Sequence, residues 1–305
     1  MSPLPISAVS APPLPYQPAV LAPVPAAGRF VAFDLRTGFD PRPALQRLPG
    51  EFSPARSVLG LGQPLLLALG RTIPGLRPFP ALCGPAVAFA STQRALWSFI
   101  GGADPGQVHE QAGALAGLLG EGFVLREEVS TFKYRGGRDL TDYEDGTENP
   151  KDDLAVAAAI SSAGGSGFCG GSFVAVQRYV HDLERFGRLP ASVRDAVFGR
   201  SHADNRELPD APVSAHVKRA AQESFDPPAF MVRRSMPWGD LGSHGLYFVA
   251  YGESLDRFER VLTRMAGLED GVVDGLLGWS HATSGGYYWC PPVHDGRIDL
   301  RALGI

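Results

Sequence analysis

The sequence predicts an α+β protein made of two ferredoxin-like halves, with antiparallel sheets of the dimeric α+β barrel type. Two observations indicate this class. Apolar segments rich in β-branched and aromatic residues alternate with amphipathic helical segments, and their order, βαββαβ, occurs twice. No residue-level repeat accompanies this order, so the duplication rests on the elements alone. The predicted units are a proline-rich arm over residues 1–27, a first half over 28–150 and a second half over 151–305.

The first half is predicted to contain four strands and two helices. The strands are Phe30–Leu35, Ser57–Leu61, Leu96–Ile100 and Phe123–Tyr134. A short helix is predicted after Asp40-Pro41, and a Pro- and Gly-rich passage over 62–80 follows the second strand. A longer helix begins after Asp104, because Asp104-Pro105-Gly106-Gln107 combines a capping side chain with proline at the first helical position and Gln two residues later.

The second half repeats the pattern after a glycine-rich passage. The predicted strands are Ser172–Val180, Phe230–Ser235 and Leu246–Tyr251, and one helical stretch covers 182–198. A further helix is predicted to begin at a Ser254 cap, with Glu253–Arg257 and Asp256–Arg260 pairs on its exposed face.

Composition narrows the class of protein. With 305 residues, 44% hydrophobic and 20% charged, the chain is typical of a globular protein, and no apolar run reaches transmembrane length. The net charge of −4 gives no basic footprint for nucleic acid. Three scattered cysteines and the absence of a recognisable signal before Arg29 predict a cytoplasmic protein with no membrane partner.

The segment from Arg138 to Pro150 is the strongest candidate for a functional site. It holds five carboxylates between Asp139 and Glu148, with Asp-Gly and Asn-Pro turn signals. A solvated acidic turn is one interpretation. The other is an active-site loop, because basic and histidine-bearing segments occur downstream at 215–219 and 231–239.

Seven histidines are present, and none has zinc-ligand spacing to another His or Cys. His216 lies on a short polar segment beside a basic cluster. A single imidazole of this kind suits a haem iron, which needs one proximal ligand. His181, at the end of a predicted strand, is the competing candidate, although its neighbours Asp182 and Glu184 also suit a solvated strand end.

Several motifs together resemble the bacterial dye-decolorising peroxidases, class B (P). The segments that carry the resemblance are Asp145-Gly146-Thr147-Glu148-Asn149-Pro150, 171–186, Gly199-Arg200, His216, Val232-Arg233-Arg234-Ser235-Met236-Pro237 and 284–292. The resemblance implies one b-type haem in the C-terminal half of a duplicated ferredoxin-like fold. The family's acidic motif reads Gly, two variable residues, Asp, Gly, and here Asp142 replaces its first glycine.

The resemblance also assigns roles to individual residues. Asp145 corresponds to the catalytic carboxylate, Arg233 to the distal arginine, and Ser235 stands where many relatives have Asn. His216 is the expected proximal iron ligand, with Asp274 as the acceptor of its second ring proton. The remaining expected contacts to the cofactor are Arg200, Glu148, Gly146 and Phe248.

The chemistry of peroxide cleavage agrees with these roles. A carboxylate such as Asp145 can move a proton between the two peroxide oxygens, and Arg233 can stabilise the charge on the departing one. The expected activity is a haem-dependent peroxidase that uses hydrogen peroxide to oxidise small aromatic reductants, such as dyes and phenolics, in one-electron steps through a ferryl intermediate. A homo-oligomer is expected. The alternatives are a haem carrier, which needs His216 alone, and a cofactor-free interaction module.

Overall fold

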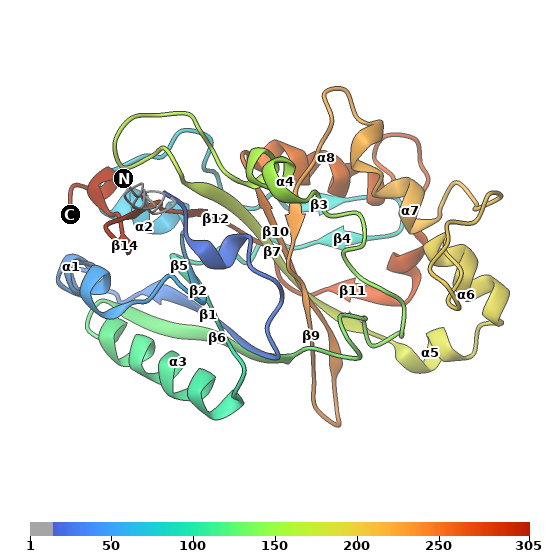
Figure 1. Cartoon of the computed structure of the whole chain (residues 1–305), viewed down its shortest axis with the longest axis horizontal. Helices are drawn as coiled ribbons and strands as arrows, with labels where there is room; N and C mark the ends of the chain where they lie inside the picture. The colour runs from blue at the N-terminus through green and yellow to red at the C-terminus, as the bar shows by residue number, and fades with distance from the viewer. Residues whose placement is uncertain (1–14) are drawn as a thin grey trace, which may run out of the picture.

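The computed structural model describes residues 15–305, and within them two four-stranded antiparallel sheets join edge to edge (Figure 1). The N-terminal half contains β1 (Ala27–Leu35), α1 (Arg42–Glu51), β2 (Ser57–Leu61), β5 (Leu96–Gly102), α3 (Pro105–Leu119) and β6 (Phe123–Phe132). A short helix, α2 (Gln63–Ala68), and a small hairpin of β3 (Leu82–Cys83) and β4 (Ala88–Phe89) are inserted between β2 and β5.

The C-terminal half follows the linking helix α4 (Asp152–Ala159). Its main sheet contains β7 (Ser172–His181), β9 (Met236–Gly239), β10 (His244–Gly252) and β12 (Gly286–Cys290), and its longest helix is α8 (Leu255–Met265). The shorter elements are α5 (Leu183–Gly187), α6 (Ala191–Phe198), α7 (His216–Arg219), β8 (Val232–Arg233), β11 (Ser280–Ala282), β13 (Val293–His294) and β14 (Arg297–Ile298). Single 3₁₀ turns occur at Pro18–Val20, Gln222–Ser224, Gly275–Gly278 and Arg301–Leu303.

Strand order confirms the predicted duplication. The N-terminal sheet runs β2-β5-β1-β6 and the C-terminal sheet runs β9-β10-β7-β12, so each half places its second, third, first and fourth main strands in that order. The halves meet where β12 pairs with β2 at Trp289 and Leu61, and where β6 pairs with β9 at Thr131 and Trp238. At both junctions the fourth main strand of one half therefore pairs with the second main strand of the other half, and this pairing closes an antiparallel barrel. The predicted α+β class is confirmed, while the predicted domain boundaries stay predictions.

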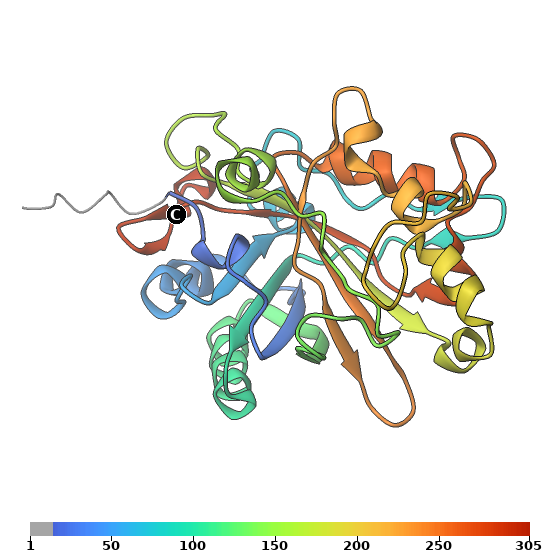
Figure 2. The same ribbon diagram turned by 45° about the vertical axis from the view of Figure 1, so that its right-hand side comes forward.

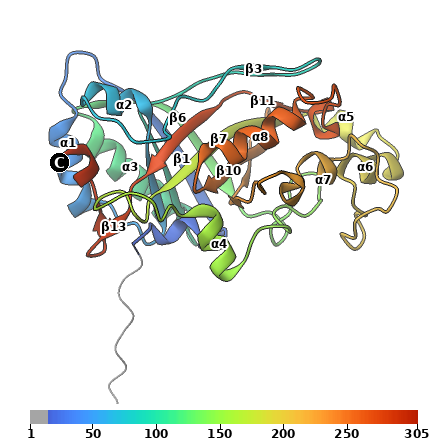
Figure 3. The ribbon, with the colours of Figure 1, turned by 90° about the horizontal axis from the view of Figure 1, so that it is seen from above.

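Alternation along the strands separates two apolar regions. Val31 and Phe33 of β1 belong to a core shared with α1 and α3, whereas Phe30 and Ala32 face the space between the two sheets. The C-terminal half does the same, with Phe248 toward α8 and Tyr247 toward the other sheet. Figure 3 shows the consequence, since α1, α2 and α3 cover one end of the molecule and α8, α7 and α6 the other.

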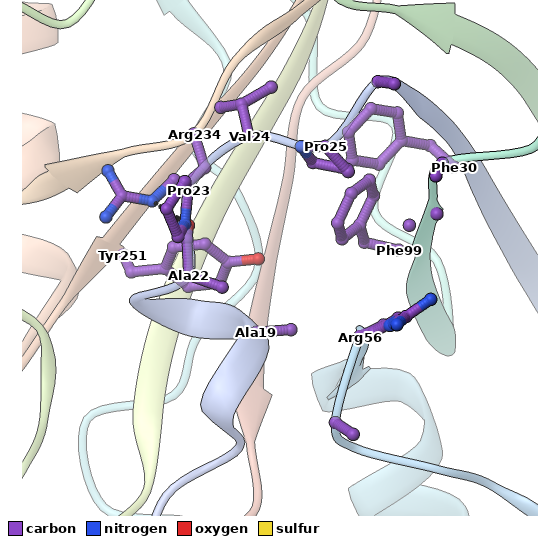
Figure 4. Close-up of a pocket in the computed structure, with 15 residues that line it drawn as sticks. Ala19, Ala22, Pro23, Val24, Pro25, Phe30, Arg56, Phe99, Arg234 and Tyr251 are labelled. Atoms are coloured by element: carbon purple, nitrogen blue, oxygen red, sulfur yellow. Dashed lines mark hydrogen bonds between the residues drawn. The ribbon is translucent and has the colours of Figure 1, made fainter.

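The segment before β1 packs against both halves. Gln17 is 1% exposed, and its amide group bonds to both the N–H and the carbonyl oxygen of Leu59 on β2 and to the carbonyl oxygen of Pro291 after β12. Figure 2 shows this dark-blue segment running along the strands. With Phe30, Phe99 and Tyr251 it walls an apolar cavity of about 820 Å³ (Figure 4). Residues 1–14 of the predicted arm lie outside the described residues.

Several local predictions need correction. Ser254 occupies the N-cap position of α8, but its side chain makes no capping hydrogen bond. Glu253 pairs with Arg257 as expected, whereas Asp256 pairs with Arg77 of the inserted region, because a long-range guanidinium lies closer than Arg260. The single helix predicted over 182–198 is split into α5 and α6, since Pro190 has no N–H to continue the first of them.

Candidate active site

The largest apolar cavity of the C-terminal half lies between α8 and the face of β7 and β10 that points away from the N-terminal sheet. Counted together with its open mouth, this space measures about 970 Å³, and like most small-molecule sites it is lined mainly by apolar side chains with a few polar groups. Its apolar walls come from Leu246, Phe248, Phe258, Val261, Leu262, Met265, Leu276 and Leu277. The polar side chains that reach it include Asp145, His216 and Arg233, so the structure brings these three predicted site residues together.

His216 begins the short helix α7 and is held by a carboxylate behind it. Its Nδ1 lies 2.8 Å from Oδ2 of Asp274, whose side chain is fully buried. An ionised carboxylate can only accept, so Nδ1 carries the proton and donates it to Asp274. The other carboxylate oxygen accepts the N–H of Leu276. Nε2 of His216 makes no hydrogen bond within residues 15–305 and is free to act as a ligand.

The acidic segment 138–150 forms a loop, as predicted, and its first turn is closed by Asp139. The N–H of Asp139 donates to the Tyr143 carbonyl oxygen, and the N–H of Asp142 donates to the carbonyl oxygen of Asp139. Asp142 has φ +68°, a left-handed conformation that glycine adopts without strain. This explains why the family's acidic motif has glycine at this position. Asp tolerates this conformation better than most residues, and here its carboxylate also bonds to Arg135. The loop geometry is thus compatible with the substitution.

Asp145 and Arg233 differ in how their charges are balanced. Burial raises the pKa of the Asp145 carboxyl, the charge of Asp139 adds to this, and Arg233 and His216 oppose it. Arg233 forms no ion pair within the described part of the chain, and its Nε is buried without a partner. The guanidinium therefore retains donors for a ligand that is negatively charged or becomes so during a reaction.

Asn149 connects the acidic loop to the strand that carries Arg233. Its Oδ1 accepts the N–H of Arg233 at 2.8 Å, and its Nδ2 donates to the Arg233 carbonyl oxygen at 3.0 Å. The sequence indicated only a turn at Asn149-Pro150. The paired bonds show a second role, which is to fix the backbone of Arg233 relative to Asp145.

We expect Asn149→Ala to lower the free energy of unfolding by about 1–3 kcal/mol, because two part-buried hydrogen bonds are lost together. Chemical denaturation measures this. Asn149→Asp keeps the acceptor and loses the donor, so its effect should be intermediate. The control is Thr283→Ala, which removes one exposed side-chain bond to the carbonyl oxygen of Arg178 and should cost less. An equal loss in free energy of unfolding in the two alanine variants would contradict the role of Asn149 in fixing the Arg233 backbone.

The other predicted site residues lie around the cavity at different depths. Phe248 lines it directly. Glu148, Arg200 and Gly146 line an adjoining polar cavity of about 820 Å³ that shares Asp145, His216 and Arg233, and Arg200 is paired with Glu148 at 2.7 Å. Ser235 faces a third cavity beside Asp145 and accepts the N–H of Val249 at 3.4 Å, and it is not among the residues that line the main cavity.

His181, the competing ligand candidate, is not a solvated strand end. It is 7% exposed at the end of β7, with Nε2 3.2 Å from Asp139 and Nδ1 2.8 Å from the Ser280 hydroxyl. Both ring nitrogens are thus occupied, unlike those of His216. Two buried donors on the same cavity wall, Nε2 of Gln177 and Nε1 of Trp279, have no partner within residues 15–305.

Comparison with known proteins identifies relatives of this arrangement. The C-terminal domain of Dyp-type peroxidases matches residues 136–295. A dye-decolorizing peroxidase from Mycobacterium tuberculosis is 31% identical over 224 residues, which cover 72% of this chain and 67% of the relative. The dye-decolorizing protein from V. cholerae superimposes with a TM-score of 0.83 at 26% identity, over 94% of this chain and 98% of that one.

A structure with a bound cofactor is also similar. A variant of DypB from Rhodococcus jostii RHA1 in complex with heme has a TM-score of 0.83 and 29% identity, with 90% of this chain and 95% of that chain covered. Because 90% of this chain is covered, the similarity spans both halves of the barrel.

Proposed function

The chain belongs to the DyP-type family of dye-decolorising haem peroxidases, and we propose that it binds one b-type haem in the cavity beside α8 and uses hydrogen peroxide to oxidise small aromatic reductants. The observation that carries the proposal is the meeting of a free imidazole nitrogen, a carboxylate and an unpaired guanidinium at one largely apolar cavity. A haem carrier needs only the first of these, so the other two favour the enzyme.

The residues of the cavity fit a haem group. Its apolar walls suit a flat macrocycle, and His216 offers one nitrogen with a carboxylate behind it, as metal-bound histidines commonly do. Arg233 and the adjoining polar cavity with Arg200 supply cationic groups for the acidic side of a haem. His216 would hold the iron, with Asp274 fixing its ring and increasing its basicity. Among residues 15–305, no group of three or more acidic, His or Cys side chains forms a separate metal site.

The side chains then divide the work on peroxide. Bound haem would supply the iron at which the oxygen–oxygen bond is broken and would store the oxidising equivalents. Asp145 accepts a proton from the first peroxide oxygen and delivers it to the second. Arg233 stabilises the negative charge that builds on the departing oxygen in a site with little water. The apolar walls exclude solvent and so strengthen this interaction.

We further propose class B membership, a homo-oligomer and a cytoplasmic location. The similarity to DypB supports the class. Three free cysteines, two of them exposed, suit a reducing compartment. None of the helices within residues 15–305 is long and apolar enough to cross a membrane.

A spectrum of the reconstituted protein tests the proposal. Titrating the apo-protein with haem should saturate at one equivalent and give a Soret band distinct from that of free haem. Mixing the loaded protein with hydrogen peroxide should then change the spectrum and oxidise an added phenol. Saturable haem binding without either reaction would favour the haem carrier instead.

The raised pKa of Asp145 predicts an acid limit to the peroxide step. Asp145 acts as a base only when ionised, so the rate should fall as pH drops through its pKa, above the value of about 3.9 for an ordinary aspartate. Oxidation of bulky dyes benefits from protons, so turnover should peak in mildly acidic solution while the peroxide step stays fast near neutrality. Stopped-flow and steady-state rates from about pH 4 to 8 test both. Glu144→Gln removes an exposed neighbouring charge, which solvent and salt already screen. It should hardly change the pH below which the peroxide step slows. Dye turnover that rises steadily toward alkaline pH would point to another proton acceptor.

A further inference from the structure

A buried, hydrogen-bonded His–Asp pair near the start of the acidic loop takes no part in the proton transfers described above. His181 is 7% exposed and Asp139 is 8% exposed, and both side chains reach the wall of the candidate active-site cavity. Buried ionisable groups are costly to keep unless they are well bonded, so a pair at this place requires an explanation.

The imidazole of His181 is fixed on three sides. His181 and Ser280 are register partners on β7 and β11, and the Ser280 hydroxyl lies 2.8 Å from Nδ1. Trp279 meets the ring edge-on with 5.0 Å between centroids. His181 is the last residue of β7, beyond the residues that pair with β10 and β12, and its backbone is held there by the pairing with Ser280 of β11. Nε2 is left to face the acidic loop.

Asp139 connects that fixed ring to the loop. Its Oδ1 lies 3.2 Å from Nε2 of His181, and its Oδ2 accepts the N–H and the hydroxyl of Thr141 at 3.0 and 2.6 Å. With three donors around it, the carboxylate is held in its ionised form. Burial alone would raise the pKa of Asp139, but the His181 and Thr141 bonds outweigh it and hold that pKa below its usual value.

Besides Tyr143, which is stacked on Phe198 of α6, the loop has two hydrogen-bonded attachments to strands, one buried and one part-buried. Asp139 attaches its beginning to β7 through His181, and Asn149 attaches its end to β8 through the Arg233 backbone. Both strands pair with β10. Asp145 lies between the two attachments, and its own N–H makes only a long contact, 3.4 Å, to Gly137.

We propose that His181 and Asp139 are positioning residues for Asp145. The bond between them holds the acidic loop against β7 so that Asp145 faces the cavity, and Asp139 keeps a fixed negative charge beside it. The inference rests on the proposed function for its catalytic consequence, but the geometry of the loop does not depend on bound haem.

Two variants separate the effect of the His181–Asp139 hydrogen bond from the effect of the negative charge of Asp139. His181→Leu removes the ring donor and should slow the peroxide step about tenfold to a hundredfold, because small displacements of a catalytic group have effects of this size. Asp139→Asn keeps a bond, since the amide can donate to Nε2 once the ring proton moves to Nδ1 and bonds to Ser280. Asp139→Asn should therefore slow the peroxide step less than His181→Leu does. Its lost negative charge should lower the Asp145 pKa, so the pH below which the rate falls should also move down. The titratable groups that act on Asp145 are Arg233 from β8, His216 from α7 and Asp139 from the same loop.

Two further variants complete the kinetic series. His181→Gln retains a side-chain donor and should recover most of the rate lost in His181→Leu. Glu184→Gln changes an exposed carboxylate three residues away and is the matched control. Haem content should stay near one per chain in all four variants. Loss of haem from the His181 variants would overturn the assignment, because it would make His181 a ligand.

A measurement on the apo-protein keeps the inference testable if no peroxidase activity is found. Carbon-13 NMR of labelled aspartate gives the Asp145 carboxyl pKa directly. It should fall in Asp139→Asn and stay unchanged in Glu184→Gln. An unmoved Asp145 pKa together with wild-type kinetics in His181→Leu would overturn the inference. An absence of peroxidase activity in the haem-loaded wild-type protein would instead count against the proposed function.

Discussion

Haem-free protein is the expected product when His216→Ala is purified without added haem. His216 is the one histidine at the cavity with a free ring nitrogen, and its removal takes away the single bond from the chain to the iron. Removing even an indirect partner of a metal ligand commonly weakens binding by about 10- to 100-fold, so loss of the ligand itself should exceed this. The haem-to-protein ratio, measured from the pyridine haemochrome spectrum, checks the result.

Three controls make this result specific. In His216→Gly, free imidazole should occupy the vacated space and restore haem binding, which a general loss of folding would prevent. His181→Ala should keep its haem, because both ring nitrogens of His181 are already bonded to the protein. Asp274→Asn should bind haem less tightly than the wild type but retain more of it than His216→Ala, and it should raise the reduction potential, since a neutral amide makes His216 a weaker electron donor to iron. Normal haem content in His216→Ala with loss in His181→Ala would reverse the ligand assignment.

Local sequence signals predicted the helices and strands whose formation depends on residues adjacent in the sequence. Ser57–Leu61 is a strand with the predicted bounds. The helix after Asp104 begins as expected, with the Asp104 side chain accepting the Gln107 N–H at 2.8 Å. Apolar content and capping depend on a few adjacent residues, which is why a pattern in the sequence is enough to find them.

Elements defined by distant partners were missed. β9 contains Pro237, which argues against a strand, yet its edge pairs with β10 and contacts β6 at one residue. No strand was predicted at β12, which lies in a segment that contributed only to the family resemblance, although its pairing with β7 and β2 closes the barrel.

The candidate site shows the same division between local and distant information. His216, Asp145 and Arg233 came from motifs, because their chemistry is visible in the residue types. The positions of Asn149 and His181 matter through partners 84 and 42 residues away, respectively, in the sequence. No local pattern records such a pairing. A turn signal and a strand end were therefore reasonable interpretations that left the positioning roles undetected.

The second large effect is expected in Arg233→Leu, which should react with hydrogen peroxide at least about a hundredfold more slowly than the wild type. Negative charge builds on the departing oxygen in a site walled by apolar side chains, where a fixed cation is worth far more than in water. Arg233 has no carboxylate partner within residues 15–305, so its charge is available for this purpose. Stopped-flow mixing of the haem-loaded variant with peroxide, as a function of peroxide concentration, gives the second-order rate constant.

Comparison with three other variants shows which property of Arg233 matters. Arg233→Lys keeps the charge but loses the planar fork of donors, so it should fall between Arg233→Leu and the wild type. Asp145→Ala should be slowed no more than Arg233→Leu, because a water molecule can replace part of the proton transfer whereas nothing nearby replaces the cation. Arg200→Leu removes a guanidinium that is already paired with Glu148 and should have the smallest effect on this rate. A wild-type rate constant in Arg233→Leu would exclude charge stabilisation by this residue, and the site would then depend on Asp145 for the whole of its effect on peroxide.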